Sequence, residues 1–266
     1  MASRSHERAG QAAHTSSVLA FLRHIAQTMS VHNTFITRQF DWDGRPESTA
    51  VRAANRALRM IGTRLRAPRP AAPTSTVEQR INIYHFVSQL IAHDVQGDLI
   101  DVGSFVGETA ALITTVLEGE GSLDRRLHVY DAFEPSPNTP EPLAVLQQNF
   151  EQHQLPLPEI HRGRLEETIP DELPNEISFV HLNCPWAGDP TKHEHLLREL
   201  MGHIYLRMTH GSICSIADYT DSDQLPGATN AQPAVKLAFD KFMADKPERI
   251  SVLYAGELGH AYFRKL

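Results

Sequence analysis

The sequence predicts an α/β fold with a mostly parallel sheet, helices on both of its faces and an additional helical segment at the N-terminus. From residue 76 onward, apolar runs of strand length alternate with segments of helical periodicity. This alternation is typical of a parallel sheet covered by helices on both sides. Residues 67–73 are rich in proline and separate this part from residues 1–66, whose apolar residues recur at helical spacing. We therefore expect an N-terminal helical segment with its linker, residues 1–70, and one α/β domain, residues 71–266.

Each predicted element follows from its own pattern of apolar, polar and turn residues. Helices are predicted over about 49–66, 76–93, 108 onward, 143–153, 192–208 and 231–244. Strands are predicted over 99–102, 127–131, 159–162, 177–182, 212–216, 250–254 and 260–263. Residues 134–142 contain several prolines and form a loop long enough to serve as a lid. The order of these elements is that of a Rossmann-like fold.

Composition excludes several classes of partner. The formal net charge of −7 argues against a general nucleic-acid-binding protein. No apolar run approaches the ~20 residues needed to span a bilayer, and residues 1–6 lack the apolar core of a signal peptide. The 2 cysteines, Cys184 and Cys214, indicate neither a disulfide scaffold nor a zinc site. We expect a cytoplasmic protein with no membrane and no nucleic-acid partner.

The most informative stretch is residues 97–109, where a predicted strand, a turn with two glycines and a helix follow one another. Glycines let a backbone approach a ligand closely, and the start of a helix offers free N–H groups. The spacing Asp101-x-Gly103-x-x-x-Gly107 differs from the G-x-G-x-x-G pattern that binds a pyrophosphate. It favours S-adenosylmethionine (SAM), which has no phosphate and whose amino-acid part an acid at a strand end can approach. An ordinary strand–turn–helix junction is the alternative.

Further candidate SAM-binding residues surround this turn. Asp131 ends the second strand, where nucleotide-binding α/β folds place an acid that accepts hydrogen bonds from ribose hydroxyls. Ser104 and Thr109 are candidates for the SAM carboxylate, although Thr109 also suits a helix N-terminus. Arg164 follows the third strand and is a candidate for the adenine or for an acidic acceptor, with a solvated arginine as the alternative.

Polar residues also follow the next strands. Asn183 and Asp218 come directly after the fourth and fifth predicted strands, as Asp101 and Asp131 end the first and second. Ligands in parallel α/β sheets bind at the carboxyl ends of the strands. The four side chains are therefore predicted to surround one site.

At this point the chain resembles the macrocin O-methyltransferase (TylF-type) family of class I SAM-dependent methyltransferases, over roughly residues 76–266. The blocks that carry the resemblance are residues 97–107, 129–133, 163–170 and 211–219, the helix with Ala234, Val235 and Phe239, and the closing strand with residues 262–265. The resemblance implies a SAM-dependent methyltransferase that acts on a small natural-product or sugar-like molecule. It also implies a homodimer in which N-terminal helices lie near the acceptor.

The chain departs from this family at the residues that hold a divalent metal. Where the family has L-D-x-D-x-Y and D-D-Y, residues 182–186 are LNCPW and residues 217–219 are ADY. Mg²⁺ prefers hard oxygen ligands, usually with carboxylate charge. Asn183 offers a neutral amide, and Asp218 is the one acid left in these two motifs. We therefore expect a degenerate metal site, predict no metal ligand, and regard Mg²⁺ as a doubtful cofactor.

The chemistry of methyl transfer indicates which residues could be catalytic. Displacement at a sulfonium methyl mainly requires that donor and acceptor be held in line. A sugar hydroxyl is a poor nucleophile and also needs a base or a metal. Lost metal ligands thus point to an easier acceptor, to a histidine base or to another use of SAM. We take Asp218, His181 and Asn183 as candidate catalytic residues, although a strand histidine is more often a packed core residue.

Two further readings remain open. The fold could use SAM for other chemistry, as a cyclase or lyase, or bind SAM without catalysis, and the altered metal motifs favour this reading. A nucleotide-dependent oxidoreductase or a binding module is disfavoured by the glycine spacing. The amphipathic helices of the first 66 residues cannot bury their apolar faces alone, so we expect them to pack on the main domain or on a second subunit.

Overall fold

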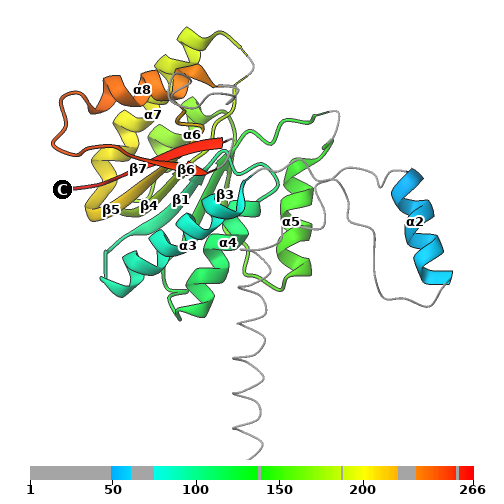
Figure 1. Ribbon diagram of the computed structural model, residues 1–266. Coiled ribbons are helices and arrows are strands. Elements are labelled where there is room, and N and C mark those ends of the chain that lie inside the picture. Colours follow the sequence, from blue (N-terminus) through cyan, green and yellow to red (C-terminus); the bar gives the residue numbers. More distant parts are fainter. Residues whose placement is uncertain (1–48, 61–74, 137–138, 187, 221–231, 256–257) are drawn as a thin grey trace, which may run out of the picture.

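The structure, a computed structural model, describes residues 49–60, 75–136, 139–186, 188–220, 232–255 and 258–266. Its centre is a 7-stranded sheet of order β3-β2-β1-β4-β5-β7-β6 (Figure 1). The strands are β1 (Asp98–Val102), β2 (Leu127–Asp131), β3 (Glu159–Arg162), β4 (Ile177–Leu182), β5 (Met208–Ala217), β6 (Ser251–Ala255) and β7 (Leu258–Arg264). Neighbours from β3 to β5 pair in parallel, and β7 pairs antiparallel with both β5 and β6. The predicted mostly parallel sheet is confirmed.

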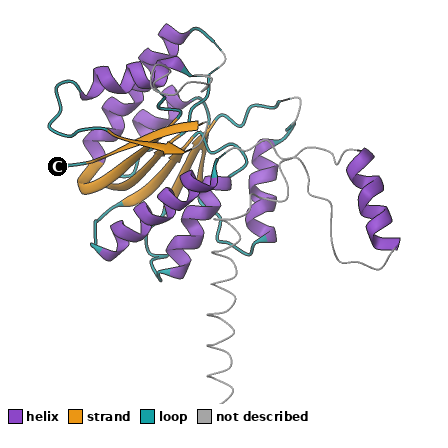
Figure 2. Cartoon of the chain, in the orientation of Figure 1, coloured by secondary structure: helices purple, strands orange, loops and turns teal. Residues whose placement is uncertain are grey.

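Helices cover both faces of the sheet (Figures 1 and 2). One face carries α3 (Val77–Ala92), α4 (Glu108–Gly119) and α5 (Pro142–Gln152), and the other carries α6 (Leu165–Glu172), α7 (Pro190–Arg207) and α8 (Pro233–Met243). Successive strand side chains point to opposite faces. Leu99 and Val129 therefore belong to one hydrophobic core, while Ile100 and Tyr130 belong to the other.

The predicted strands and helices of residues 76–266 are found, with two differences. α6 was not predicted, because it is short, carries Pro170 in its interior and has few apolar residues to reveal a helical period. β5 begins at Met208, directly after α7, whereas the sequence predicted a strand from residue 212. Met208 extends the strand because it pairs with Ile177 at the start of β4.

The N-terminal segment is described only in part. α2 (Thr49–Met60) lies within the predicted helix 49–66 and stands apart from the sheet and its helices in Figure 1. Residues 1–48 and 61–74, which include the linker and the other predicted N-terminal helix, lie outside the described residues. The packing of this segment and the homodimer stay predictions.

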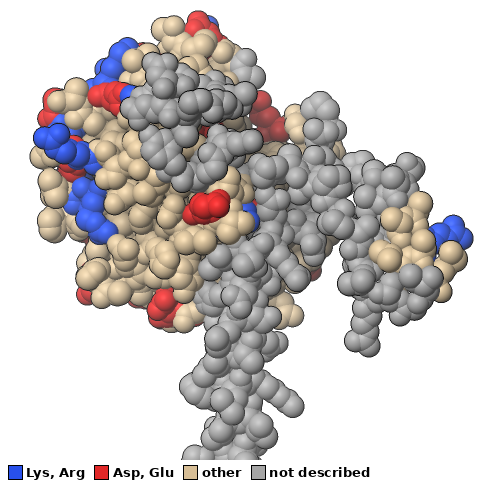
Figure 3. All heavy atoms as spheres, in the orientation of Figure 1, with Lys and Arg blue, Asp and Glu red and all other residues tan. Residues whose placement is uncertain are grey.

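Surface charge is unevenly spread over the face shown in Figure 3. Most of the described surface there belongs to residues other than Lys, Arg, Asp and Glu, and basic side chains gather along the edge near the C-terminus. Both cysteines are free thiols. None of the helices within the described ranges has the length and apolar character needed to cross a bilayer.

Candidate functional site

A cavity of ≈ 790 Å³ opens at the carboxyl ends of the parallel strands. Its volume is within the range of about 300–1,000 Å³ that small-molecule sites occupy. Eight of the predicted site residues line it: Gly103, Ser104, Thr109, Asp131, Arg164, His181, Asn183 and Asp218. The other two, Asp101 and Gly107, do not line it. The strand ends thus bring together most of the side chains that the sequence singled out.

The two glycines of the turn are required by contacts within the protein. Gly103 has φ +83°, and a Cβ there would lie 1.8 Å from the carbonyl oxygen of Asn183. Gly107 has φ +80° and precedes α4, and its Cβ would lie 2.7 Å from the side chain of Leu146 on α5. The sequence predicted that these glycines let the backbone come close to a ligand, but in the structure they let it come close to the residue after β4 and to α5. Of the two glycines, only Gly103 borders the cavity.

Asp131 is held in place by two backbone amides. The N–H of Phe105 donates to its Oδ2 at 2.9 Å, and the N–H of Phe133 donates to its Oδ1 at 2.6 Å. Burial raises the pKa of Asp131, and these two hydrogen bonds oppose that rise. Each carboxylate oxygen can accept more than one hydrogen bond, so Asp131 retains acceptor capacity toward the cavity that it lines.

Asp101 and His181 form a buried pair. Nδ1 of His181 lies 2.7 Å from Oδ1 of Asp101, whose side chain has no exposed surface. Oδ2 of Asp101 has no hydrogen-bond partner in the part of the chain that the structure describes. A carboxylate beside Nδ1 favours the tautomer with its proton on Nδ1 and a lone pair on Nε2. Since His181 lines the cavity, the pair presents a potential base to a bound molecule.

Two more titratable residues stand near His181. Burial raises the pKa of Asp218, and the nearby His181 works in the opposite direction. Burial lowers the pKa of His260 to about 4, with His181 contributing, so this imidazole is neutral. Nε2 of His260 lies 2.9 Å from Nδ2 of Asn82 on α3. His181, Asp218 and His260 therefore form one polar part of the cavity wall.

A second polar part of the cavity wall, which contains Glu108, was not predicted from the sequence. The guanidinium of Arg80 on α3 donates to the Ser75 carbonyl at 2.7 Å and to Oε1 of Glu108 at 3.4 Å. Both side chains of the Arg80–Glu108 pair are buried, and Glu108 lines the cavity. Burial raises the pKa of Glu108 to about 7, although Arg80 favours its ionised form. The available signals were a glutamate at the first position of α4 and an arginine in the first turn of α3.

The outer wall is formed by mixed side chains. Arg164 is largely exposed, and its Nε donates to Oε1 of Glu166 at 2.8 Å, so both residues are paired at the cavity rim. The ring of Trp186 stacks on that of His193 at a centroid distance of 5.9 Å. Nε2 of His193 lies 2.9 Å from the Cys184 carbonyl, which assigns this histidine to holding the loop. Tyr219 is buried in the core and does not wall the cavity.

The residues at the ends of β4 and β5 are a poor match for the Mg²⁺ that the family resemblance implies. Within residues 183–186 and 217–220, which the structure describes, Asp218 is the one carboxylate and Asn183 supplies a neutral amide. The next acids in the sequence, Asp221 and Asp223, lie outside the described residues. This donor set is poor for an ion that requires several hard oxygen ligands. SAM fits better, because its size suits the cavity and Asp131 stands at a strand end.

Comparison with known proteins gives a family and a set of similar folds. Residues 21–167 match the family model described as Macrocin-O-methyltransferase (TylF). The chain is similar to the O-methyltransferase NovP, with TM-score 0.64, 14% identity and coverage of 90% of this chain and 97% of that one. It is similar to CalS11, a calicheamicin methyltransferase, with TM-score 0.54, 14% identity and coverage of 91% and 92%.

A third similar structure is the methyltransferase PaMTH1 of Podospora anserina, described as bound to SAH, with TM-score 0.52, 11% identity and coverage of 84% of this chain and 91% of that one. At such identities these likenesses show the fold. No curated protein matches the chain in sequence.

Proposed function

Because this chain belongs to the macrocin-O-methyltransferase (TylF) family, we propose that it transfers the methyl group of SAM to a hydroxyl of a small natural-product or sugar-like molecule, without a tightly held Mg²⁺. The observation that carries this proposal is the cavity at the strand ends, which combines Asp131 with the Asp101–His181 pair. NovP and CalS11, described as an O-methyltransferase and as a TDP-rhamnose methyltransferase, support the class of acceptor.

The cofactor would lie along the turn after β1. Asp131 would accept hydrogen bonds from the ribose hydroxyls, while Gly103, Ser104 and Thr109 would border the amino-acid part. Arg164 would lie at the adenine side of the rim. Asp101 and Gly107 would act through the shape of the turn, because neither lines the cavity. PaMTH1, whose structure is described as SAH-bound, supports SAM as the methyl donor.

Bound SAM supplies an activated methyl carbon, and this chain's residues prepare the acceptor. Nε2 of His181 would remove the proton of the acceptor hydroxyl as the new C–O bond forms. The Asp101 carboxylate would hold the ring in the required tautomer and stabilise the imidazolium that results. Asp218 and Asn183 would orient the hydroxyl by hydrogen bonds, since burial raises the pKa of Asp218 and favours its protonated form.

Two measurements test this proposal. Calorimetry with the full chain is expected to detect SAM binding, with NAD as the control cofactor that does not bind. Mass spectrometry after incubation with SAM and a panel of nucleotide sugars, glycosides and phenols is expected to detect S-adenosylhomocysteine. Methylthioadenosine in its place would indicate a cyclase or lyase, and absence of SAM binding would overturn the proposal.

The homodimer belongs to the same proposal. The family resemblance supports it, and light scattering on the full chain is expected to give twice the mass of 29.8 kDa. A mass equal to that of one chain would contradict this part alone.

A further inference from the structure

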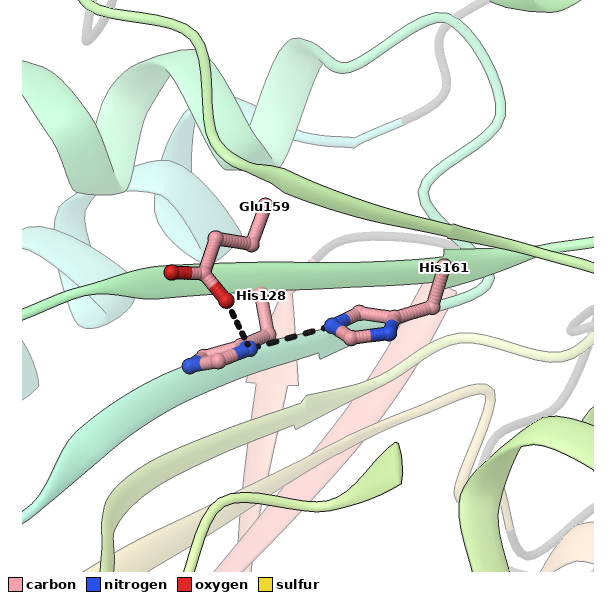
Figure 4. A group of neighbouring side chains, drawn as sticks. All are labelled: His128, Glu159 and His161. Atoms are coloured by element: carbon pink, nitrogen blue, oxygen red, sulfur yellow. Dashed lines mark hydrogen bonds and ion pairs between the residues drawn. The ribbon is translucent and has the colours of Figure 1, made fainter. Parts of the chain in front are cut away.

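A cluster of side chains of the types that bind metals lies on the edge strand β3 and its neighbour β2, outside the cavity. His128 is the second residue of β2, and Glu159 and His161 belong to the edge strand β3 (Figure 4). The parallel register pairs His128 with Glu159 and Tyr130 with His161. His128 and Glu159 therefore lie near the amino ends of their strands, His161 lies two residues further along β3, and none of the three lines the cavity.

The three side chains converge on one point. Nδ1 of His128 lies 3.0 Å from Nε2 of His161 and 3.3 Å from Oε2 of Glu159. All three ligand atoms lie within 4.8 Å of one another. Zinc bonds of about 2.0–2.1 Å place neighbouring ligand atoms of a tetrahedral ion about 3.3–3.4 Å apart. The two separations that involve Nδ1 of His128, 3.0 and 3.3 Å, are close to this spacing.

The far atoms of all three side chains are held by charged neighbours. Nδ1 of His161 lies 2.5 Å from Oε2 of Glu172, and Nε2 of His128 lies 3.3 Å from Oδ2 of Asp98. The other oxygen of Glu159 accepts from Arg126 at 3.0 Å. Metal-binding histidines commonly donate their second N–H to a carboxylate in this way, and ligating carboxylates are themselves hydrogen-bonded.

The outer neighbours influence which ring nitrogens carry protons. The carboxylates of Asp98 and Glu172 favour N–H groups at Nε2 of His128 and at Nδ1 of His161. That choice leaves two nitrogen lone pairs facing each other at 3.0 Å, with a Glu159 oxygen beside them. Facing lone pairs repel, so this pair of tautomers favours a cation between the two nitrogens. A proton on Nδ1 of His128, which the Glu159 oxygen at 3.3 Å favours, would instead join the two rings by a hydrogen bond.

Packing fixes the rings in this orientation. The ring of His161 stacks on Tyr130 at 4.4 Å and on His128 at 5.3 Å between centroids. The side chain of His128 is 7% exposed, whereas that of Glu159 is 46% exposed, so solvent reaches the point of convergence from one side. An exposed side leaves room for a water molecule as a fourth ligand.

We propose that Nδ1 of His128, Nε2 of His161 and Oε2 of Glu159 bind one Zn²⁺ ion, which fastens the edge strand β3 to β2. Two imidazoles and one carboxylate suit zinc and similar transition-metal ions, whereas Mg²⁺ favours oxygen ligands. Asp98 and Glu172 act as positioning residues for the two imidazoles. The site has a structural role and is independent of methyl transfer.

The test is a calorimetric titration of the chelator-treated full chain with ZnCl₂, and with MgCl₂ in parallel. We expect one Zn²⁺ per chain with a defined affinity, a melting temperature that rises with the Zn²⁺ concentration, and neither effect with Mg²⁺. Glu159→Gln and His161→Gln should weaken Zn²⁺ binding by more than about 100-fold, and Glu172→Gln by about 10- to 100-fold.

A control is needed because the chain has 15 histidines. His85→Gln changes an exposed histidine of α3 and should leave zinc affinity unchanged. Glu159 is partly exposed, so Glu159→Gln decides the question even if His161→Gln fails to fold. Equal zinc affinity in Glu159→Gln and in the unchanged chain, or no zinc binding by the unchanged chain, would overturn the proposal. A shared proton would then occupy the site.

Discussion

Asp101 on β1 and His181 on β4 are direct partners in the register of two adjacent parallel strands, and their side chains meet at 2.7 Å beneath the cavity. The residues lie 80 positions apart in the chain. Sheet pairing thus supplies the histidine with a buried carboxylate, and this carboxylate sets which ring nitrogen is free to face an acceptor.

Replacing His181 should remove the proposed base. We expect His181→Gln to lower the turnover number by about 10²- to 10⁴-fold, the usual contribution of general base catalysis. Asp101→Asn should also lower it, because an amide can donate to Nδ1 and so move the ring proton to Nε2. Initial rates of S-adenosylhomocysteine formation measure both effects. SAM affinity, measured by calorimetry, should change little in His181→Gln, and an unchanged turnover number would exclude His181 as the base.

Asp131→Ala should weaken SAM binding. Two hydrogen bonds to a charged acceptor are lost, each worth about 1.5–3 kcal/mol, so the dissociation constant should rise by at least about 100-fold. Calorimetry measures the change, and Asp124→Ala, at an exposed acid of the loop before β2, is the control. Because Asp131 also accepts from Phe105 and Phe133, the melting temperature without SAM must be compared as well. Unchanged affinity would remove Asp131 from the site.

Glu108 should make stability depend on pH in a defined direction. Its pKa is raised from 4.5 to about 7 in the folded chain, mainly by burial. Below pH 4.5 the carboxyl is protonated in both states and has no effect. As the pH rises from 4.5 to 7, the unfolded chain loses this proton while the folded chain keeps it, so the free energy of unfolding falls.

Glu108→Gln should remove that loss. Relative to the variant, the unchanged chain should lose on the order of 2–3 kcal/mol over this interval. Urea unfolding at several pH values measures the difference, and Glu118→Gln, at an exposed glutamate of the same helix, is the control. If the free energy of unfolding changes with pH in the same way in the unchanged chain and in Glu108→Gln, the raised pKa of Glu108 is contradicted.

Methyl transfer should not require added Mg²⁺. Asp218 is the one carboxylate at the described ends of β4 and β5, so we expect full turnover after EDTA treatment and no gain from Mg²⁺. Asp218→Asn keeps hydrogen-bonding capacity and should lower the rate less than His181→Gln does. EDTA would also remove zinc from the proposed site at Glu159. The Glu159→Gln variant is therefore assayed in parallel with the unchanged chain, to separate the effect of losing zinc from that of losing Mg²⁺. Loss of activity that Mg²⁺ restores would show a metal site at the strand ends.

Gly103→Ala should destabilise the fold strongly. A Cβ at this position would lie 1.8 Å from the Asn183 carbonyl oxygen, and the backbone φ is +83°. Strain and overpacking together should cost about 3 kcal/mol or more. Gly121→Ala is a matched control, because its φ is +68° but nothing lies within 4 Å of the added Cβ, so about 1–2 kcal/mol is expected. Urea unfolding compares the two, and equal losses would refute the steric explanation.

Local patterns in the sequence were sufficient for the strands, most helices and the residues at the strand ends. Apolar runs, helical periodicity and the glycine turn are signals carried by neighbouring residues, and strand ends in a parallel sheet share one edge. Asp131, Asn183 and Asp218 were therefore predicted together and do line one cavity. α6 was missed because Pro170 and several acids leave no helical period to recognise.

Only the tertiary structure decided which distant residues touch. The side chain of Asp101 was predicted to face SAM, but the pairing of β1 with β4 places it on His181. The packing of α3 against α4 joins Arg80 to Glu108, and the pairing of β2 with β3 brings His128 to His161. Strand order and register are set by the packing of both hydrophobic cores, and a shift of one residue in a strand would turn its side chains to the other face of the sheet. No local pattern carries that information, because it belongs to the whole sheet.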